Sequence, residues 1–186
     1  MQMTDSRTIA APPNEVWDAI LNPEVLKQCV PGCKEMSGSA EDGFEATVVQ
    51  KVGPVKATFK GTVVLSDRIE GQSLTLTGEG KGGAAGFAKG GADVTLTEVE
   101  GGTQLHYDVD AKVGGKLAQL GSRVIDGFAK KMADQFFTNF QNVVEGPQND
   151  DETGPDTGEE GAAPETSAAA QEGGEQKKGW FKKLVS

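Results

Sequence analysis

The sequence contains few of the residues that usually carry catalysis or cross-links. Its 186 residues include one His, one Tyr and two Cys. Covalent catalysis needs a nucleophile, a base and an orienting group together, and this chain offers no convincing set, so we expect no enzyme and no catalytic residues. Two Cys are also too few for a disulfide scaffold, which favours a reducing, cytoplasmic setting.

Long apolar runs and an excess of positive charge are missing as well. No stretch approaches the roughly 18–20 apolar residues of a membrane-spanning helix, and residues 1–10 contain no apolar secretory segment. The net charge is −10, whereas a nucleic-acid-binding protein presents a basic face to the phosphates. We therefore expect neither a transmembrane protein nor a nucleic-acid partner.

Composition divides the chain into three parts. Residues 1–146 are long enough for one domain with its own core. Residues 147–176 hold nine acidic and no basic side chains and lack Val, Ile, Leu and aromatic residues. They cannot bury enough apolar surface to fold, so we predict a disordered acidic linker. Residues 177–186 then form a short tip with four Lys.

The order of patterns within residues 1–146 predicts an α+β domain. A strand over 2–10 and two short helices come first, the second ending at Pro31-Gly32. Apolar and polar residues then alternate as far as residue 113, which is typical of half-buried antiparallel strands. Residues 116–145 place apolar side chains every three or four positions, predicting one long helix. A curved sheet gripping such a helix can enclose an apolar cavity.

Four stretches carry a resemblance to a known family. They are CVPGCKEM at 29–36, VGPVKATFKG at 52–61, GEGKGGAAGFAKG at 78–90 and VGGKLAQLGSRVIDGFAKKMADQFF at 113–137. With the helix-grip order of elements, they resemble the CoxG family of carbon monoxide dehydrogenase subunits, within the START-like SRPBCC superfamily, over about residues 1–145. The resemblance implies a helix-grip fold and a non-catalytic accessory protein that helps place molybdenum CO dehydrogenase at the cytoplasmic membrane.

The expected cavity supplies the candidate ligand-binding residues. They are Phe59, Leu76, Phe87, Tyr107, Leu117, Gly121, Val124, Phe128, Met132 and Phe136. A stripe of Met and aromatic residues is more often plain core, so both interpretations stay open. Tyr107 would add a polar tip able to hydrogen-bond a carbonyl. Because the suspected enzyme partner must pass electrons to an acceptor, we expect a membrane quinone as a reversible ligand, with no covalently bound cofactor.

Two features near this cavity allow more than one interpretation. Gly121 and Gly127 fall inside the predicted long helix, where each Gly costs about 1 kcal/mol relative to Ala. Close packing on the sheet or room for a ligand would offset that cost. Phe87 is out of phase with Val94 and Leu96 unless Gly90-Gly91 forms a bulge. It is therefore a lid residue, a pocket anchor or an exposed contact for the enzyme.

The C-terminal tip combines cations with apolar side chains, namely Lys177, Lys178, Trp180, Phe181, Lys182, Lys183 and Leu184. Each Lys near an anionic leaflet contributes about 1 kcal/mol, and Trp favours the headgroup level. We predict reversible, peripheral contact with the inner face of the cytoplasmic membrane. Docking on a protein and a purely solubilising tail are the alternatives. The linker would give a reach of about 30 Å.

The remaining motifs predict little chemistry. Gly78-x-Gly80-x-x-Gly83 matches a dinucleotide fingerprint but lacks the crossover helix that such a site needs. Cys29, Cys33 and His106 are too few for a metal site, so none is expected. The alternative functions are a general carrier of apolar ligands or lipids without a dehydrogenase partner, and a helix-grip enzyme.

Overall fold

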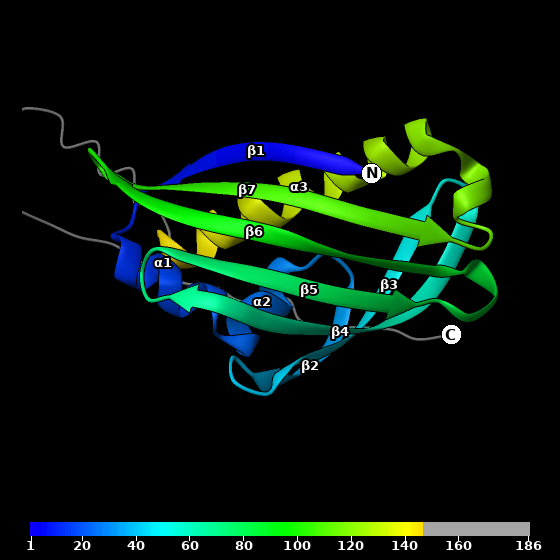
Figure 1. Cartoon of the computed structure of the whole chain (residues 1–186), viewed down its shortest axis with the longest axis horizontal. Helices are drawn as coiled ribbons and strands as arrows, with labels where there is room; N and C mark the ends of the chain where they lie inside the picture. The colour runs from blue at the N-terminus through cyan, green and yellow to red at the C-terminus, as the bar shows by residue number, and fades with distance from the viewer. Residues whose placement is uncertain (147–186) are drawn as a thin grey trace, which may run out of the picture. The chain divides into compact units, whose positions relative to one another are not determined.

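The protein is represented by a computed structural model that describes residues 1–146 (Figure 1). The predicted linker at 147–176 and the predicted tip at 177–186 lie outside the described residues. Within 1–146, seven antiparallel strands form one sheet in the order β1-β7-β6-β5-β4-β3-β2. The strands are β1 (Gln2–Ile9), β2 (Cys33–Ser39), β3 (Gly43–Val52), β4 (Val55–Ile69), β5 (Ser73–Lys81), β6 (Phe87–Val99) and β7 (Gly102–Gly114).

Strands β2 to β7 follow each other as a meander, because each pairs with the next along the chain. Gly53-Pro54 makes a two-residue turn between β3 and β4, where Val52 is paired with Val55. Gly53 has a φ of +56°, a conformation that glycine adopts without a steric penalty. Strand β1 then pairs with β7 and forms one edge of the sheet, while β2 forms the other.

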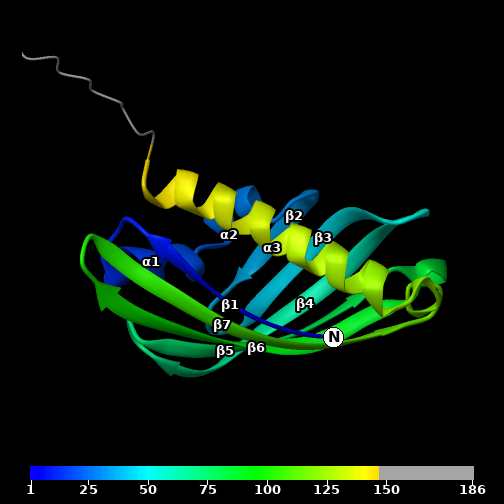
Figure 2. The same ribbon diagram turned by 90° about the horizontal axis from the view of Figure 1, so that it is seen from above.

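Three α-helices cover the concave face of this sheet in the described part of the chain (Figure 2). They are α1 (Pro13–Ile20), α2 (Pro23–Cys29) and α3 (Ser122–Val144). Proline occupies the first turn of both short helices, where its missing N–H is no loss. The Asn22 side chain caps α2 by accepting a hydrogen bond of 2.9 Å from the Glu24 N–H. None of these helices is long and apolar enough to cross a membrane.

The long helix begins later than the sequence pattern predicts. Residues Ala118–Leu120 form a 3-10 turn, and α3 starts at Ser122 rather than at 116. Gly121 immediately precedes the helix and has a φ of +84°, so the chain turns at this residue and Gly121 does not lie inside the helix. Gly127 does lie inside α3, and a Cβ at that position would meet nothing within 4 Å. Close packing on the sheet therefore explains neither glycine.

The main core lies at one end of the concave face. Its largest members come from α1, α3 and the strands, and they include Ile9, Val16, Trp17, Ile20, Leu74, Leu96, Leu105, Tyr107, Phe137 and Phe140. At the opposite end, Leu117 donates a backbone hydrogen bond of 3.0 Å to the Ala85 carbonyl. Both residues are buried there, away from the main core. This α+β arrangement of a curved sheet and a long C-terminal helix is the predicted helix-grip fold.

Candidate functional site

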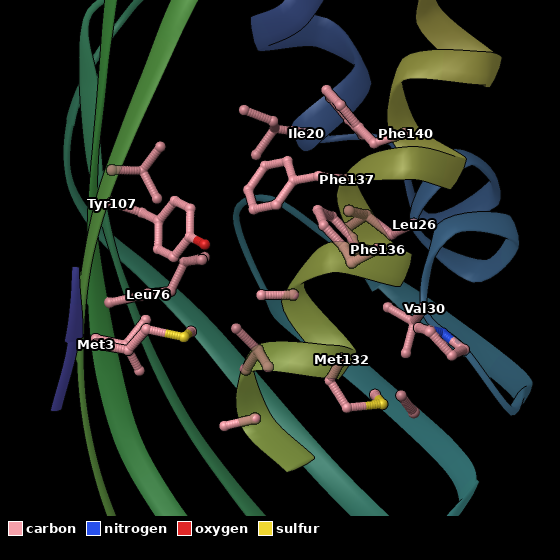
Figure 3. A pocket seen from close by; sticks show the side chains of 18 of the residues that line it. Met3, Ile20, Leu26, Val30, Leu76, Tyr107, Met132, Phe136, Phe137 and Phe140 are labelled. Atoms are coloured by element: carbon pink, nitrogen blue, oxygen red, sulfur yellow. The ribbon is translucent and has the colours of Figure 1, made fainter. Parts of the chain in front are cut away.

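An apolar cavity of about 520 Å³ separates α3 from the middle of the sheet (Figure 3). Its volume falls within the range of small-molecule sites, about 300–1,000 Å³. The lining side chains are apolar apart from one tyrosine. They are Met3, Ile20, Leu26, Val30, Pro31, Met36, Phe44, Ala46, Val63, Leu76, Ala92, Val94, Leu105, Tyr107, Val109, Phe128, Ala129, Met132, Ala133, Phe136, Phe137 and Phe140.

Side chains from helix α3 and from the strands both line the cavity, each at the spacing that its secondary structure sets. Helix α3 supplies Phe128, Met132 and Phe136 at intervals of four residues, which places them on one face. In the strands every second residue faces the cavity, as Leu105, Tyr107 and Val109 do in β7. Small side chains such as Ala46 and Ala92 leave space opposite the helix, and the three Met residues in the lining offer flexible, polarisable walls.

Five of the predicted ligand-binding residues line this cavity. They are Leu76, Tyr107, Phe128, Met132 and Phe136. Figure 3 shows Tyr107 projecting from the sheet toward Phe136 and Phe137 of α3, whereas Met132 lies on the side of that helix nearer Val30. Their contact with a ligand stays a prediction.

The structure places three of the other predicted residues near the far end of the sheet. Phe59 lies on the cavity side of β4, but its ring lies against Gly82. Leu117 is buried beside Ala85, and Gly121 forms the turn before α3. Alternation along a strand predicts which face Phe59 occupies but not its distance from the cavity. The helical period did not apply to Leu117 and Gly121, because α3 begins only at Ser122.

Val124 and Phe87 do not line the cavity. Val124 is 40% exposed, lies one helical turn before Phe128, and is close to Gly53 in the turn between β3 and β4. Phe87 is 41% exposed, and its ring covers Gly114 of the neighbouring strand. Strand β6 pairs with both neighbours without a shift in register, so the bulge that would turn Phe87 inward does not form. Of the three roles considered for Phe87, only that of an exposed contact fits this placement.

Sequence reasoning missed several cavity residues from the first part of the chain, including Met3, Leu26, Val30 and Met36. The sequence could have indicated Leu26 and Val30, because they are one helical turn apart at the end of the short second helix and so lie on one face of it. Met3 was harder to find, because its strand shows no clean alternation. The register pairs it with Val109 of β7 and so places it on the cavity face.

Tyr107 is the one polar side chain in the cavity wall. It is 5% exposed and stacks on Phe137 with the ring centroids 5.0 Å apart. Its hydroxyl is buried and has no hydrogen-bond partner among the described residues. Burial raises the pKa of Tyr107, while the nearby Arg7 opposes that rise. The hydroxyl therefore stays protonated at neutral pH and is available as a donor.

The two cysteines and the histidine lie apart from the cavity wall. Cys29 is buried, which raises the pKa of its thiol to about 11. Cys33 is partly exposed and donates an S–H bond of 3.3 Å to the Glu35 carbonyl. His106 faces outward between Ser6 and Asp108. Over residues 1–146, no group of three or more His, Cys, Asp or Glu side chains is arranged to hold a metal ion.

A curved sheet that grips a terminal helix around an apolar cavity defines the class of helix-grip, ligand-cavity proteins. The same fold occurs in a conserved protein from Geobacillus kaustophilus, with 29% identity, a TM-score of 0.73 and coverage of 78% of this chain and 95% of that one. Protein CV1439 from Chromobacterium violaceum shares it at 17% identity, TM-score 0.58 and coverage of 78% and 97%. Protein Ms6760 from Mycobacterium smegmatis also shares it, with 17% identity, a TM-score of 0.57 and coverage of 76% of this chain and 89% of that one.

The sequence narrows this class to one family. The family model for CoxG, a subunit of carbon monoxide dehydrogenase, matches residues 6–145. The chain therefore belongs to the CoxG family. A search of the curated proteins found no match.

Proposed function

We propose that this protein is a non-catalytic accessory protein that recruits molybdenum CO dehydrogenase to the inner face of the cytoplasmic membrane. In this proposal it also binds a quinone reversibly in its cavity and so couples the enzyme to the respiratory chain. The family name supplies the partner. The observation that carries the ligand is the cavity of about 520 Å³ with a single polar side chain in its wall.

A quinone matches this cavity in three respects. Its ring and isoprenoid tail are apolar, as the lining is. Its flat ring suits the aromatic side chains of α3, where the Phe136 and Phe137 rings meet edge to face at 5.2 Å. Its carbonyl oxygens accept hydrogen bonds, which the Tyr107 hydroxyl donates. A quinone also dissolves in the membrane to which the tip is proposed to attach.

The membrane part of the proposal rests on the sequence of residues 177–186. Four Lys beside Trp180 and Phe181 combine attraction to anionic lipid with insertion at the headgroup level. The acidic segment before them is repelled by the same surface. It would thus hold the domain away from the lipid while the tip binds.

Deletion of residues 177–186 tests recruitment. In cells that express CO dehydrogenase, we expect the deletion to move the enzyme from sedimented membranes to the supernatant. A variant with Trp180→Ala and Phe181→Ala retains the four Lys and separates apolar insertion from charge. An unchanged distribution of the enzyme in the deletion strain would rule out the recruiting role.

Met132→Trp tests whether the cavity matters for electron transfer. The larger side chain points into the hollow, so it should displace the quinone and slow electron delivery from CO dehydrogenase, while the enzyme still sediments with membranes. Val143→Trp is the matched control, because Val143 lies on the same helix but is 38% exposed. Equal electron-transfer rates in the two variants would contradict a quinone role for the cavity.

A further inference from the structure

One side of the cavity differs from the rest because charged residues of an edge strand face inward there. Asp5 of β1 is paired with Tyr107 of β7, and Arg7 is paired with Leu105. Paired residues share a face of the sheet, so both charged residues lie on the concave face. Thr4 and Ser6 occupy the outer face instead, where they contact Asp108 and His106.

Arg7 is held in a defined position by three neighbours. Its Nη2 forms an ion pair of 3.0 Å with Asp5 and hydrogen-bonds Asp134 of α3. Its guanidinium lies over the Phe137 ring, with 5.7 Å between Cζ and the centroid. The bond to Asp134 raises the pKa of Arg7, so the group is positively charged at all relevant pH values.

Two buried polar atoms in this corner have no well-oriented hydrogen-bond partner among the described residues, although the Arg7 and Tyr107 side chains lie close enough for each to shift the pKa of the other. They are Nε of Arg7, which is a donor, and the hydroxyl oxygen of Tyr107. Buried polar atoms are nearly always hydrogen-bonded, because leaving one unpaired is costly. Tyr107 is 5% exposed, and its hydroxyl points from the sheet into the cavity (Figure 3). The two unpaired atoms together indicate a site for a ligand that accepts hydrogen bonds.

The corner also marks the boundary between two hollows. A polar hollow of about 500 Å³ lies between β1 and α3, and Asp5, Arg7, Asp126 and Lys130 contribute to its wall. It shares four wall residues with the apolar cavity, namely Met3, Tyr107, Ala129 and Ala133. A ligand oxygen at Tyr107 would therefore sit where apolar surroundings change to polar ones.

We propose that Arg7 Nε–H and the Tyr107 hydroxyl form a subsite that binds one neutral carbonyl oxygen of an apolar ligand whose body fills the cavity. A carbonyl oxygen has two lone pairs, so it can accept a hydrogen bond from each donor. This subsite rests on the proposed quinone-binding function and adds the residues that would orient the ring.

The charges around Arg7 select a neutral acceptor over an anionic one. Arg7 is flanked by the carboxylates of Asp5 and Asp134, so these three groups together carry a net negative charge. The carboxylate of a fatty acid would be repelled by that charge, whereas a ketone or quinone carbonyl would not. The subsite therefore distinguishes a quinone from a fatty acid of similar length.

An inward charge on an edge strand also has a purely structural use, since it hinders edge-to-edge pairing between sheets. The proposal and this simpler explanation differ in their consequences for ligand choice. If the charges only prevent edge-to-edge pairing, the cavity should show no preference for ligands with a carbonyl group. The subsite predicts such a preference, and it predicts that the preference depends on both Arg7 and Tyr107.

Binding of three probes to the full-length protein, measured by calorimetry, tests the subsite. The probes are a 1,4-naphthoquinone with a short isoprenoid tail, the matching naphthalene without carbonyls, and a fatty acid of similar length. We expect the wild type to prefer the quinone. Tyr107→Phe and Arg7→Lys should each weaken quinone binding about tenfold while changing naphthalene binding less than about twofold. Arg7→Lys keeps the charge beside Asp5 but removes the Nε donor.

Ser6→Ala and Arg68→Lys are matched controls, because both side chains face away from the cavity, and they should leave all affinities unchanged. Tyr107→Phe removes an unpaired hydroxyl, so the midpoint of thermal unfolding without ligand should stay the same or rise. If Tyr107→Phe and Arg7→Lys weakened the binding of quinone and of naphthalene equally, or weakened neither, the subsite alone would be overturned. Absence of quinone binding by the wild type would overturn the proposed function as well.

Discussion

The two halves of α3 have the same helical period but different surroundings. Residues 133–144 contribute Phe137 and Phe140 to the core, with exposed fractions of 7% and 0%. Residues 122–132 contain no buried residue, and their inward side chains, Phe128 and Met132, border the cavity. Phe137 and Phe140 border the cavity too, so both halves of α3 contribute to its wall, but only the second half also packs in the core.

Polar contacts follow the same division. In the second half, Asn139 donates to the Cys29 carbonyl at 3.1 Å and Gln141 donates to the Thr8 carbonyl at 2.8 Å. These bonds fasten α3 to α2 and β1. No side-chain hydrogen bond connects residues 122–132 to the rest of the described chain. Residues 122–132 are therefore the less firmly attached half of α3.

Truncation of one phenylalanine in each half tests this difference directly. Phe140→Ala should lower the free energy of unfolding by about 3–5 kcal/mol, because it removes a fully buried ring. Phe128→Ala should cost about 1 kcal/mol, since its ring is half-buried and borders an existing hollow. Urea unfolding at pH 7 measures both. Similar losses at the two positions would mean that the halves are packed alike.

High pH should weaken the packed half through Cys29. Its thiol pKa is raised by burial from 9.0 to about 11, so the folded state favours the neutral thiol. This contribution is complete below pH 9 and is lost as the pH rises toward 11, at about 1.4 kcal/mol per pH unit. The difference in unfolding free energy between the wild type and Cys29→Ala should shrink across that range. Parallel curves would show that the thiol does not titrate differently on folding.

Gly121 marks where the weakly attached half begins. Gly121→Ala should cost about 1–2 kcal/mol, because φ +84° is unfavourable for a residue with a Cβ. No atom obstructs the new Cβ, since nothing lies within 4 Å, so the cost comes from the backbone alone. Chemical denaturation gives the value, and unchanged stability would indicate that the turn before α3 can adopt another conformation.

Gly127→Ala is the companion substitution and should have the smallest effect, with the opposite sign. The position is helical and has open space around it, so the variant should be more stable by about 0.5–1 kcal/mol. The same denaturation experiment measures it. A loss of stability would show that the first half of α3 packs more closely on its surroundings than the structure indicates.

The sequence predicted the fold better than the site, for a physical reason. Periods of two and of three to four residues identify strands and helices, and the order of elements then limits the architecture. The period of two predicts the face that Phe59 occupies in its strand, but not how far along the sheet the cavity lies. Leu117 precedes α3, so the helical period did not apply to it. Arg7 and Asp5 were not predicted as site residues, because two charges in a short strand look like a solvated edge.

The most direct test of the proposed cavity ligand is mass spectrometry of the solvent extract from protein purified gently from its native cells. We expect one quinone per protein molecule in the wild type, and a reduced amount in Met132→Trp. An extract free of quinone, still free after the protein has been incubated with quinone-loaded vesicles, would contradict the central claim that the cavity holds this ligand.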